Sequence, residues 1–406
     1  MTTTETSPAD PLSASAPAEP LSESSPADPL SASALAELIT ALQSDGVRVE
    51  VPIEARAGGA GPADAGMLYV EGVATTLPVS APFVARSPYT LRGEDEGGWG
   101  IYRGRTRLAR ASLAPRPAYY DLTTHDGIPY WQIALLHLDS LASTVLQTCT
   151  YWGTDDQCRF CGIGVTLAAG RTIAKKTPAM LAEVAVAARD LDGAVDATLT
   201  TGSTATPDRG AMYVARCAQA VKEAAGLPVQ VQFEPPSDLS VIDRVAEMGV
   251  DSVGIHVESF DPDVLARVAP GKARWGIDRY FAAWERAVAA FGAGQVSTYV
   301  ILGMGEDEQL TVDGCKRAID LGVYPFVVPL RPVPGSLMED LSPPPSTAVE
   351  AVYRQVVPYL ASRGMSAAGV AAGCARCQAC SGIAAFERAE GGMREGRPPL
   401  PLLVAQ

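Results

Sequence analysis

Three of the eight cysteines of this 406-residue chain fall within thirteen residues, in the pattern Cys149-x8-Cys158-x2-Cys161. Thiolates at such close spacing bind soft metals, so the loop could hold an iron–sulfur cluster or part of a zinc site. A closed structural zinc site requires four ligands, and this loop supplies neither a fourth cysteine nor a histidine. An iron–sulfur cluster can leave one iron without a protein ligand, open to a substrate or a cofactor. The pattern therefore favours a [4Fe–4S] cluster with one open iron.

A second group of three cysteines lies near the end of the chain, in the pattern Cys374-x2-Cys377-x2-Cys380. This close spacing resembles ferredoxin-type ligands without the complete run, and it favours a second iron–sulfur cluster. The alternative is a zinc site that one distant residue completes. The two other cysteines, Cys217 and Cys315, could supply a fourth ligand. Both fall in helical patterns, where a free cysteine is more commonly buried as a small apolar side chain.

Composition and charge exclude several classes of function. The chain is 47% apolar and 19% charged, and its net charge of −14 makes a nucleic-acid partner improbable. No uncharged apolar run is long enough to cross a membrane, and the first residues have neither the basic nor the apolar region of a secretory signal. We therefore expect a cytoplasmic protein, in which closely spaced cysteines are metal ligands more often than disulfides.

The sequence after residue 138 alternates between short apolar strands and helical patterns. Thr177 and Thr347 are predicted N-caps of two of these helices. Six β/α units imply a parallel sheet with helices outside, closed or partly closed into a barrel, with reactive groups at the C-terminal ends of the strands. The predicted strands lie within residues 142–149, 195–202, 228–236, 251–259, 295–306 and 325–335.

We expect an α/β protein with four parts. Residues 1–33 repeat SPADPLSAS and form a disordered low-complexity tail. Residues 34–138 have short strand patterns between turn signals and form a small β-rich accessory domain. Residues 139–365 form a partial, TIM-like (β/α)6 barrel. Residues 366–406 form a C-terminal segment that carries the second group of cysteines and folds back onto the barrel rim.

These features together resemble the radical S-adenosylmethionine (SAM) superfamily. A strand leads into the three cysteines, an aromatic residue precedes the last of them, and a six-unit barrel follows; the x8 gap departs from the commonest x3 spacing. Other strand ends agree: GIHVES resembles the H-x-x-E-(S/T) strand of lipoyl and biotin synthases, and VILGMGE resembles the strand end that borders adenosine. The resemblance covers about residues 140–360. With its front and its cysteine tail, the chain is most similar to an uncharacterised radical SAM family encoded beside nitrilases.

The resemblance implies roles for individual residues. Cys149, Cys158 and Cys161 would hold a [4Fe–4S] cluster whose fourth iron binds the amino and carboxylate groups of SAM. The other implied cofactor contacts are Phe160 at the adenine, Gly202, Ser203 and Glu234 near the methionine, and Gly303 and Gly305 near the adenosine. From the residues alone, a glycine at a strand end is equally a turn residue, and a glutamate at the rim is equally an ion-pair partner.

The resemblance also implies a reaction and its partners. Reductive cleavage of SAM would yield a 5′-deoxyadenosyl radical that takes hydrogen from a small-molecule substrate, with the electron supplied by a reductase, a flavodoxin or a ferredoxin. His256 is a candidate substrate contact, and Cys315 is a candidate hydrogen donor. The rival hypothesis is a non-catalytic binding protein stapled by zinc between the two cysteine groups. More than two hundred residues separate these groups, against ~15–20 in the usual double-CxxC zinc modules.

Overall fold

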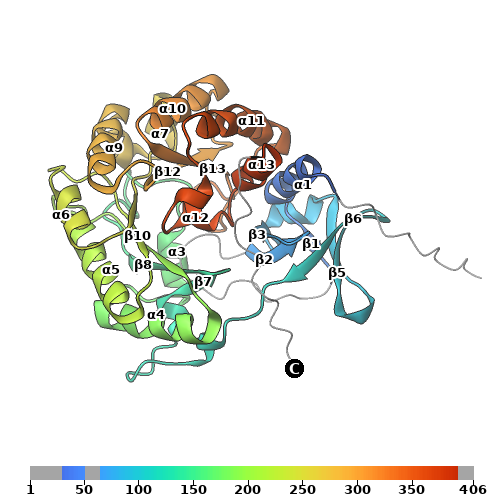
Figure 1. The fold of residues 1–406 in the computed structure, drawn as a ribbon, viewed down its shortest axis with the longest axis horizontal. Helices are drawn as coiled ribbons and strands as arrows, with labels where there is room; N and C mark the ends of the chain where they lie inside the picture. Colours follow the sequence, from blue (N-terminus) through green and yellow to red (C-terminus); the bar gives the residue numbers. More distant parts are fainter. Residues whose placement is uncertain (1–29, 51–64, 392–406) are drawn as a thin grey trace, which may run out of the picture.

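The computed structural model describes residues 30–50 and 65–391 (Figure 1). Most of the predicted N-terminal tail, residues 1–29, lies outside the described residues, as do residues 392–406 of the C-terminal segment. The first described element is helix α1 (Ala32–Asp45), which begins within the predicted tail. The side chain of Ser31 accepts a hydrogen bond from the backbone of Ala34 and so caps this helix.

The first sheet has the strand order β1-β4-β5-β6-β2-β3. All of its neighbouring strands are antiparallel except β1 and β4, which are parallel. Leu68, Leu77, Leu91 and Ile101 form its apolar core together with Leu42 of α1. The strands are β1 (Arg48–Val49), β2 (Ala65–Val70), β3 (Val73–Pro78), β4 (Tyr89–Gly93), β5 (Trp99–Arg103) and β6 (Thr106–Leu113).

The second sheet has the strand order β13-β12-β11-β10-β9-β8-β7. Strands β8 to β13 are mutually parallel, and β7 pairs with β8 as an antiparallel edge. This curled open sheet confirms the predicted partial α/β barrel. Its strands are β7 (Leu135–His137), β8 (Ser140–Leu146), β9 (Asp196–Thr201), β10 (Val229–Gln232), β11 (Ser252–Gly254), β12 (Val296–Leu302) and β13 (Val323–Pro329).

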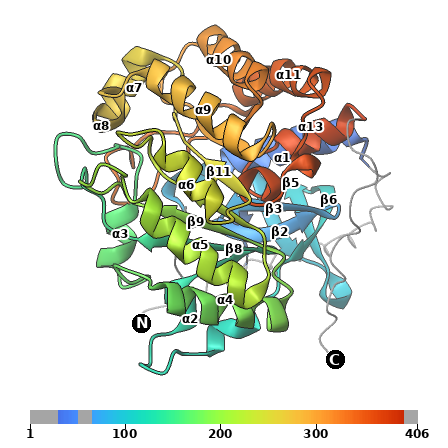
Figure 2. The ribbon, with the colours of Figure 1, turned by 60° about the vertical axis from the view of Figure 1, so that its left-hand side comes forward.

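Helices cover the outside of the second sheet, as Figures 1 and 2 show. The predicted N-cap Thr177 is confirmed, whereas the one at Thr347 is wrong, because α11 begins at Ser346 and Pro345 precedes it. The helices that follow the barrel strands are α3 (Ile163–Ala168), α4 (Pro178–Asp192), α5 (Ala211–Ala225), α6 (Val241–Glu247), α7 (Pro262–Val268), α8 (Pro270–Ala273), α9 (Ile277–Phe291), α10 (Glu308–Asp320) and α11 (Ser346–Ser362).

Several short helices connect or follow these elements. The α-helices are α2 (Tyr130–Ile133), α12 (Cys374–Cys377) and α13 (Ile383–Ala389), and the 3-10 helices are Pro82–Arg86, Asp95–Gly97, Ala118–Asp121 and Ala367–Gly369. Within the part of the chain that is described, no helix combines the length and the apolar character needed to cross a bilayer.

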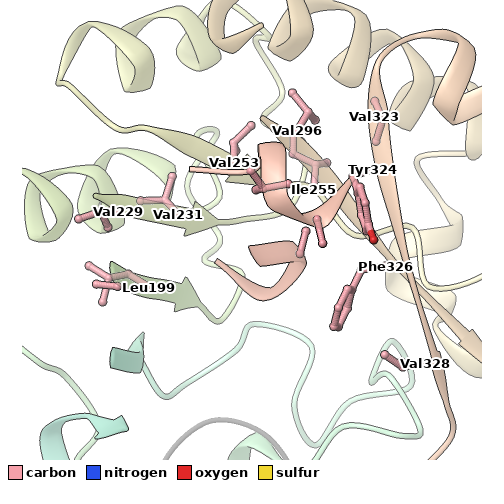
Figure 3. Packing of buried hydrophobic residues seen from close by; sticks show 14 of the residues in the cluster. Leu199, Val229, Val231, Val253, Ile255, Val296, Val323, Tyr324, Phe326 and Val328 are labelled. Carbon is pink, nitrogen blue, oxygen red and sulfur yellow. The ribbon is translucent and has the colours of Figure 1, made fainter. Parts of the chain in front are cut away.

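Strands β9 and β10 alternate apolar and polar side chains. Val229 and Val231 of β10 belong to the buried apolar cluster drawn in Figure 3, whereas Gln232 lines a cavity inside the barrel. On β9, Leu199 belongs to the same cluster, and Thr198 lines the cavity. Because successive side chains of a strand point to opposite faces, the apolar set packs under the helices and the polar set faces the interior.

The C-terminal segment lies at the N-terminal ends of the barrel strands. The backbone of Gly373 donates to the carboxylate of Asp196, the first residue of β9, at 2.8 Å. The hydroxyl of Ser252, the first residue of β11, donates to the carbonyl of Ala372 at 2.9 Å. The prediction that this segment folds onto the rim at the C-terminal strand ends is therefore wrong: its polar partners, Asp196 above all, lie at the opposite end.

The two sheets meet through the same segment. The backbone N–H of Thr76 on β3 donates to the carbonyl of Ala379 at 2.7 Å. Helix α1 packs against both α11 and α13. Strand β7, which falls within the predicted accessory domain, pairs with β8 of the barrel. The division of the chain at residues 138 and 365 stays a prediction.

Candidate active site

One cavity of about 440 Å³ occupies the interior of the barrel, and we call it the barrel cavity. Its walls include side chains from both groups of cysteines. The rim group, at the C-terminal ends of the strands, is Cys149, Cys158 and Cys161. The tail group, at the opposite end, is Cys374, Cys377 and Cys380.

The rim group is held on a loop that packs closely against the end of β9. The backbone of Thr150 donates to the carbonyl of Ser203 at 2.7 Å. A Cβ atom on Gly202 would lie 2.1 Å from the carbonyl oxygen of Thr148, which no side chain permits. Both Gly202 and Ser203 line the barrel cavity, as does Phe160. Glycine at position 202 therefore has a steric reason: the cysteine loop needs that space.

The rim cysteines are partly buried, and their thiols act on one another electrostatically. Burial raises the pKa of Cys158 well above its ordinary range, and it raises the pKa of Cys161 to about 11; the charge of Cys149 raises both further. All three cysteines line the same cavity, on one loop at the C-terminal strand ends. A metal centre supplies the positive charge that removes the protons from thiols of this kind. The donor set therefore fits an iron–sulfur cluster. Within the described residues, no three or more Cys, His, Asp or Glu side chains form a site for a single metal ion.

Glu234, just beyond β10, presents a buried carboxylate to the cavity. The hydroxyl of Tyr151 lies 3.0 and 3.2 Å from its two oxygens, and Nε1 of Trp275 donates to it at 3.0 Å. Burial, followed by the charge of Glu234, raises the pKa of Tyr151 to about 12, so the phenol stays a donor. No cation of the described residues pairs with this carboxylate. A ligand with a positive group would therefore find an uncompensated negative charge here.

A buried ion pair lies beside the rim group. Nζ of Lys272 contacts the carboxylate of Glu258 and donates to the carbonyl of His256 at 3.0 Å. Burial alone would lower the pKa of Lys272, but Glu258, with smaller contributions from Tyr280 and Cys158, raises it above its ordinary value. Lys272 is therefore charged, and the pair is neutral overall. Nothing in the sequence pattern indicated Lys272, which comes from the short helix α8.

The candidate His256 lines the barrel cavity and is partly buried. Its Nδ1 accepts a hydrogen bond from the backbone N–H of Tyr299 at 3.1 Å. Burial, with a smaller contribution from the charge of Lys272, lowers the pKa of His256 to about 3. The imidazole is therefore neutral at physiological pH.

Gly303, Gly305 and Cys315 are not among the residues that line the barrel cavity. The two glycines have φ values of 99° and 93°, which suit a turn, and the backbone of Gly303 donates to the carboxylate of Glu306 at 2.6 Å. Their contact with adenosine stays a prediction. Cys315 on α10 and Cys217 on α5 are fully buried in the apolar core.

Each cysteine of the tail group contacts a different part of the chain, and the partner of Cys380 belongs to the first sheet. The Sγ atoms of Cys374, Cys377 and Cys380 lie 3.3 Å from Nε2 of Gln232, 3.7 Å from the carbonyl of His137 and 3.3 Å from Oγ1 of Thr76, respectively. Burial is the largest cause that raises the pKa of Cys374 to about 11. Burial likewise raises the pKa of Cys377, so both thiols stay neutral unless a metal displaces their protons.

An arginine fixes the tail group to the start of the barrel strands. The guanidinium of Arg376 donates to Asp196 at 2.7 Å and to Asp139 at 2.6 Å. All three side chains are largely shielded from solvent, so the contacts are stronger than exposed ion pairs. Cys374 and Cys377 are the first and last residues of the four-residue helix α12, so the arginine holds both in place.

Part of the chain is similar to known proteins. Residues 153–313 match the family model described as the radical SAM superfamily. The bacteriochlorophyllide c C-7(1)-hydroxylase of Chlorobaculum limnaeum is 29% identical over 119 residues, which cover 29% of this chain and 30% of that protein.

Two solved structures are similar at 17% identity and a TM-score of 0.42 each. They are a methylornithine synthase, with 54% of this chain and 62% of that chain covered, and a radical SAM methyltransferase from Sphaerobacter thermophilus, with 71% and 76% covered.

Proposed function

Because the chain carries a radical SAM domain, we propose that it reductively cleaves SAM and abstracts hydrogen from a small-molecule substrate held in the barrel cavity. The observation that carries the proposal is the position of the rim group: three partly buried cysteines at the C-terminal strand ends, all of which line one cavity. When bound, a [4Fe–4S] cluster supplies the electron and the open iron at which SAM becomes a source of the 5′-deoxyadenosyl radical.

The chain's own residues would position the cofactor. Cys149, Cys158 and Cys161 would hold three irons. The uncompensated carboxylate of Glu234, which Tyr151 and Trp275 orient, would accept a hydrogen bond from the amino group of SAM. The remaining proposed contacts are Gly202 and Ser203 near the methionine, Phe160 at the adenine, and Gly303 and Gly305 near the adenosine.

The cavity wall would also keep water away from the reaction. Apolar side chains such as Ile301, Phe326 and Val328 line it beside hydroxyls and amides of the inward-facing strand positions. Enclosure of this kind prevents a reactive intermediate from meeting solvent and fixes the substrate in register.

We further propose that the tail group holds a second iron–sulfur cluster. Its three sulfur atoms face the same cavity as the rim group, so a substrate between the two groups would meet both. The cluster could pass electrons or bind the substrate at an open iron. Zinc at this site is the alternative. Neither Cys217 nor Cys315 lines the cavity, which leaves the fourth position to a non-cysteine ligand or to the substrate.

The partners follow from the chemistry. A reductase, a flavodoxin or a ferredoxin would supply the electron. A cytoplasmic location, in which the thiols stay reduced, belongs to the same proposal.

The test is production of 5′-deoxyadenosine from SAM by anaerobically reconstituted protein with a strong reductant. The triple variant Cys149→Ala, Cys158→Ala, Cys161→Ala should lose activity by at least about a hundredfold and should lose about four irons. Cys217→Ala, which removes a buried thiol of α5, is the matched control and should keep both. Turnover by the triple variant at the wild-type rate would refute the proposal, and colourless, zinc-containing wild-type protein would favour the zinc-stapled alternative.

A further inference from the structure

A buried cation without a carboxylate partner lines the barrel cavity. Arg331 lies two residues beyond β13 and is 9% exposed. Its two terminal nitrogens donate to Oγ1 and to the carbonyl of Thr76, at 3.2 and 2.7 Å. Among the described residues, no Asp or Glu forms an ion pair with it. Burial of a charged group without a counter-charge is costly, so the position indicates a ligand that supplies the negative charge.

The other charged groups of the cavity have their own partners. Lys272 and Glu258 neutralise each other. Glu234 is held by Tyr151 and Trp275 at the rim, where the proposed amino group of SAM would meet it. Among the charged side chains of the described cavity wall, Arg331 is therefore the one that has neither an ion-pair partner nor a proposed contact with SAM.

The Arg331 guanidinium lies deep in the cavity rather than at its mouth. Oγ1 of Thr76 contacts both the guanidinium and, at 3.3 Å, Sγ of Cys380. The adjacent Ser381 donates to the carbonyl of Val327, in the middle of β13. The arginine side chain therefore runs back along β13 toward the tail group.

His256 presents a second donor without an acceptor. Because its Nδ1 accepts the N–H of Tyr299, the proton of the neutral ring is on Nε2. Nε2 is buried and has no hydrogen-bond partner. The ring lies over Gly254, where a Cβ atom would come within 2.6 Å of Cε1, so the wall is shaped to hold the ring in this place. A buried N–H of this kind requires an acceptor.

His256 and Arg331 line the same cavity. Residue 256 is level with Tyr299 on β12, and Tyr299 is level with Phe326 on β13, one residue before Val327. Two donors, one of them charged, thus face the same space between the rim group and the tail group.

We propose that the barrel cavity takes a small carboxylic acid as its substrate. Arg331 pairs with the carboxylate, and Nε2–H of His256 donates to a second oxygen of the same molecule. That this acid is the substrate rests on the proposed function, whereas its binding by Arg331 and His256 does not. A guanidinium in a buried site discriminates against a neutral isostere of the same shape, because the neutral molecule leaves its charge uncompensated.

Formate is a suitable probe for Arg331 because it is the smallest carboxylate, and formamide is its neutral isostere. We would titrate 13C-labelled formate and formamide into the reconstituted full-length protein with SAM present and follow the NMR line width. Wild-type protein should bind formate saturably and formamide at least tenfold more weakly. Arg331→Gln should weaken formate binding at least tenfold, and Arg331→Lys should recover most of it. Arg286→Gln, which removes an exposed guanidinium paired with Asp243, should match wild type.

Three results would overturn the assignment of Arg331. The first is that wild-type protein shows no saturable formate binding, which would leave Arg331 as a counter-charge for the tail group. The second is that Arg331→Gln binds formate as tightly as wild type. The third is that Arg331→Gln loses SAM binding, which would place Arg331 at the cofactor. Production of 5′-deoxyadenosine without any acid is measured in the same samples. If wild-type protein produced no 5′-deoxyadenosine, the proposed function would be refuted, but the result for formate binding would still hold.

The role of His256 has its own test. Glycolate, 3-hydroxypropionate and 4-hydroxybutyrate each add one hydroxyl to acetate, propionate and butyrate, at increasing distance from the carboxylate. At least one hydroxy acid should bind wild-type protein more tightly than its parent acid, by about fivefold or more, and His256→Phe should abolish that gain. If no hydroxy acid gains affinity, or if the gain persists in His256→Phe, His256 does not contact the ligand.

Discussion

Gln232 and Glu234 lie two residues apart at the end of β10 and connect the two ends of one cavity. Nε2 of Gln232 is 3.3 Å from Sγ of Cys374 in the tail group, and Glu234 accepts a hydrogen bond from Tyr151, which lies within the rim loop. Alternate residues of a strand are only about 7 Å apart. The proposed cofactor and the proposed second cluster would thus face each other across a single small substrate.

Glu234→Gln should weaken SAM binding about tenfold, because an amide keeps the shape of the side chain but removes its negative charge. Tyr151→Phe is the matched variant: it removes one hydrogen bond to the carboxylate and should weaken binding less. Equilibrium dialysis of reconstituted protein with labelled SAM measures both. Equal affinity of wild type and Glu234→Gln would remove Glu234 from the cofactor site.

The tail group should hold about half of the iron. Reconstituted wild type should carry about eight irons per chain, and the triple variant Cys374→Ala, Cys377→Ala, Cys380→Ala should carry about four. This variant should still cleave SAM, since the rim group is intact, and should fail on the true substrate. Iron, sulfide and zinc analysis decides the question: about four irons in wild type, with one zinc that the variant lacks, would make the tail site structural.

The buried Lys272–Glu258 pair should be costly to break from one side. Lys272→Met leaves a buried carboxylate unpaired and should lower the free energy of unfolding by about 3–5 kcal/mol. Adding Glu258→Gln should restore most of the loss. Lys222→Met breaks the more exposed pair with Asp251 and should cost less than about 1 kcal/mol. Denaturant unfolding measures all three, and similar losses for Lys272→Met and Lys222→Met would contradict the burial argument.

His256 should make stability fall in acid. Its pKa is about 3 in the folded protein, against 6.5 for the ordinary group, so the unfolded chain binds the proton more tightly between these values. The contribution is complete above pH 6.5 and is lost as pH falls toward 3. Between pH 7 and pH 4.5 this loss is on the order of 2–3 kcal/mol. His256→Gln should lose less stability than wild type over that interval in urea titrations; parallel losses would show that His256 does not titrate in this way.

The sequence predicted the helices and strands better than the contacts between them. Strand and helix alternation follows from apolar periodicity, and the side chain of Thr177 caps α4 because a threonine before a proline offers the geometry of an N-cap. The prediction of Thr347 as an N-cap was wrong because Pro345, with its fixed φ, takes the N-cap position two residues earlier.

The site was predictable where ligands are close in sequence. The spacing of Cys149, Cys158 and Cys161 gave the rim group, but the partners of the tail group, Asp196 and Thr76, are 177 and 303 residues away from the atoms they bond. Such contacts depend on the three-dimensional path of the chain. Arg331 was predictable as a cavity residue, because it lies two residues beyond the last barrel strand, at the end where functional side chains are expected.

The hydrogen bond between Thr76 and Ala379 also sets an order of assembly. A ribosome releases the residues of the rim group well before the tail group, so the barrel can receive its first cofactor while the last turns are still being made. The tail cysteines reach the barrel cavity only when Ala379 pairs with Thr76 of β3. The tail group would therefore receive its metal last, through the cavity of a barrel that has already formed around it.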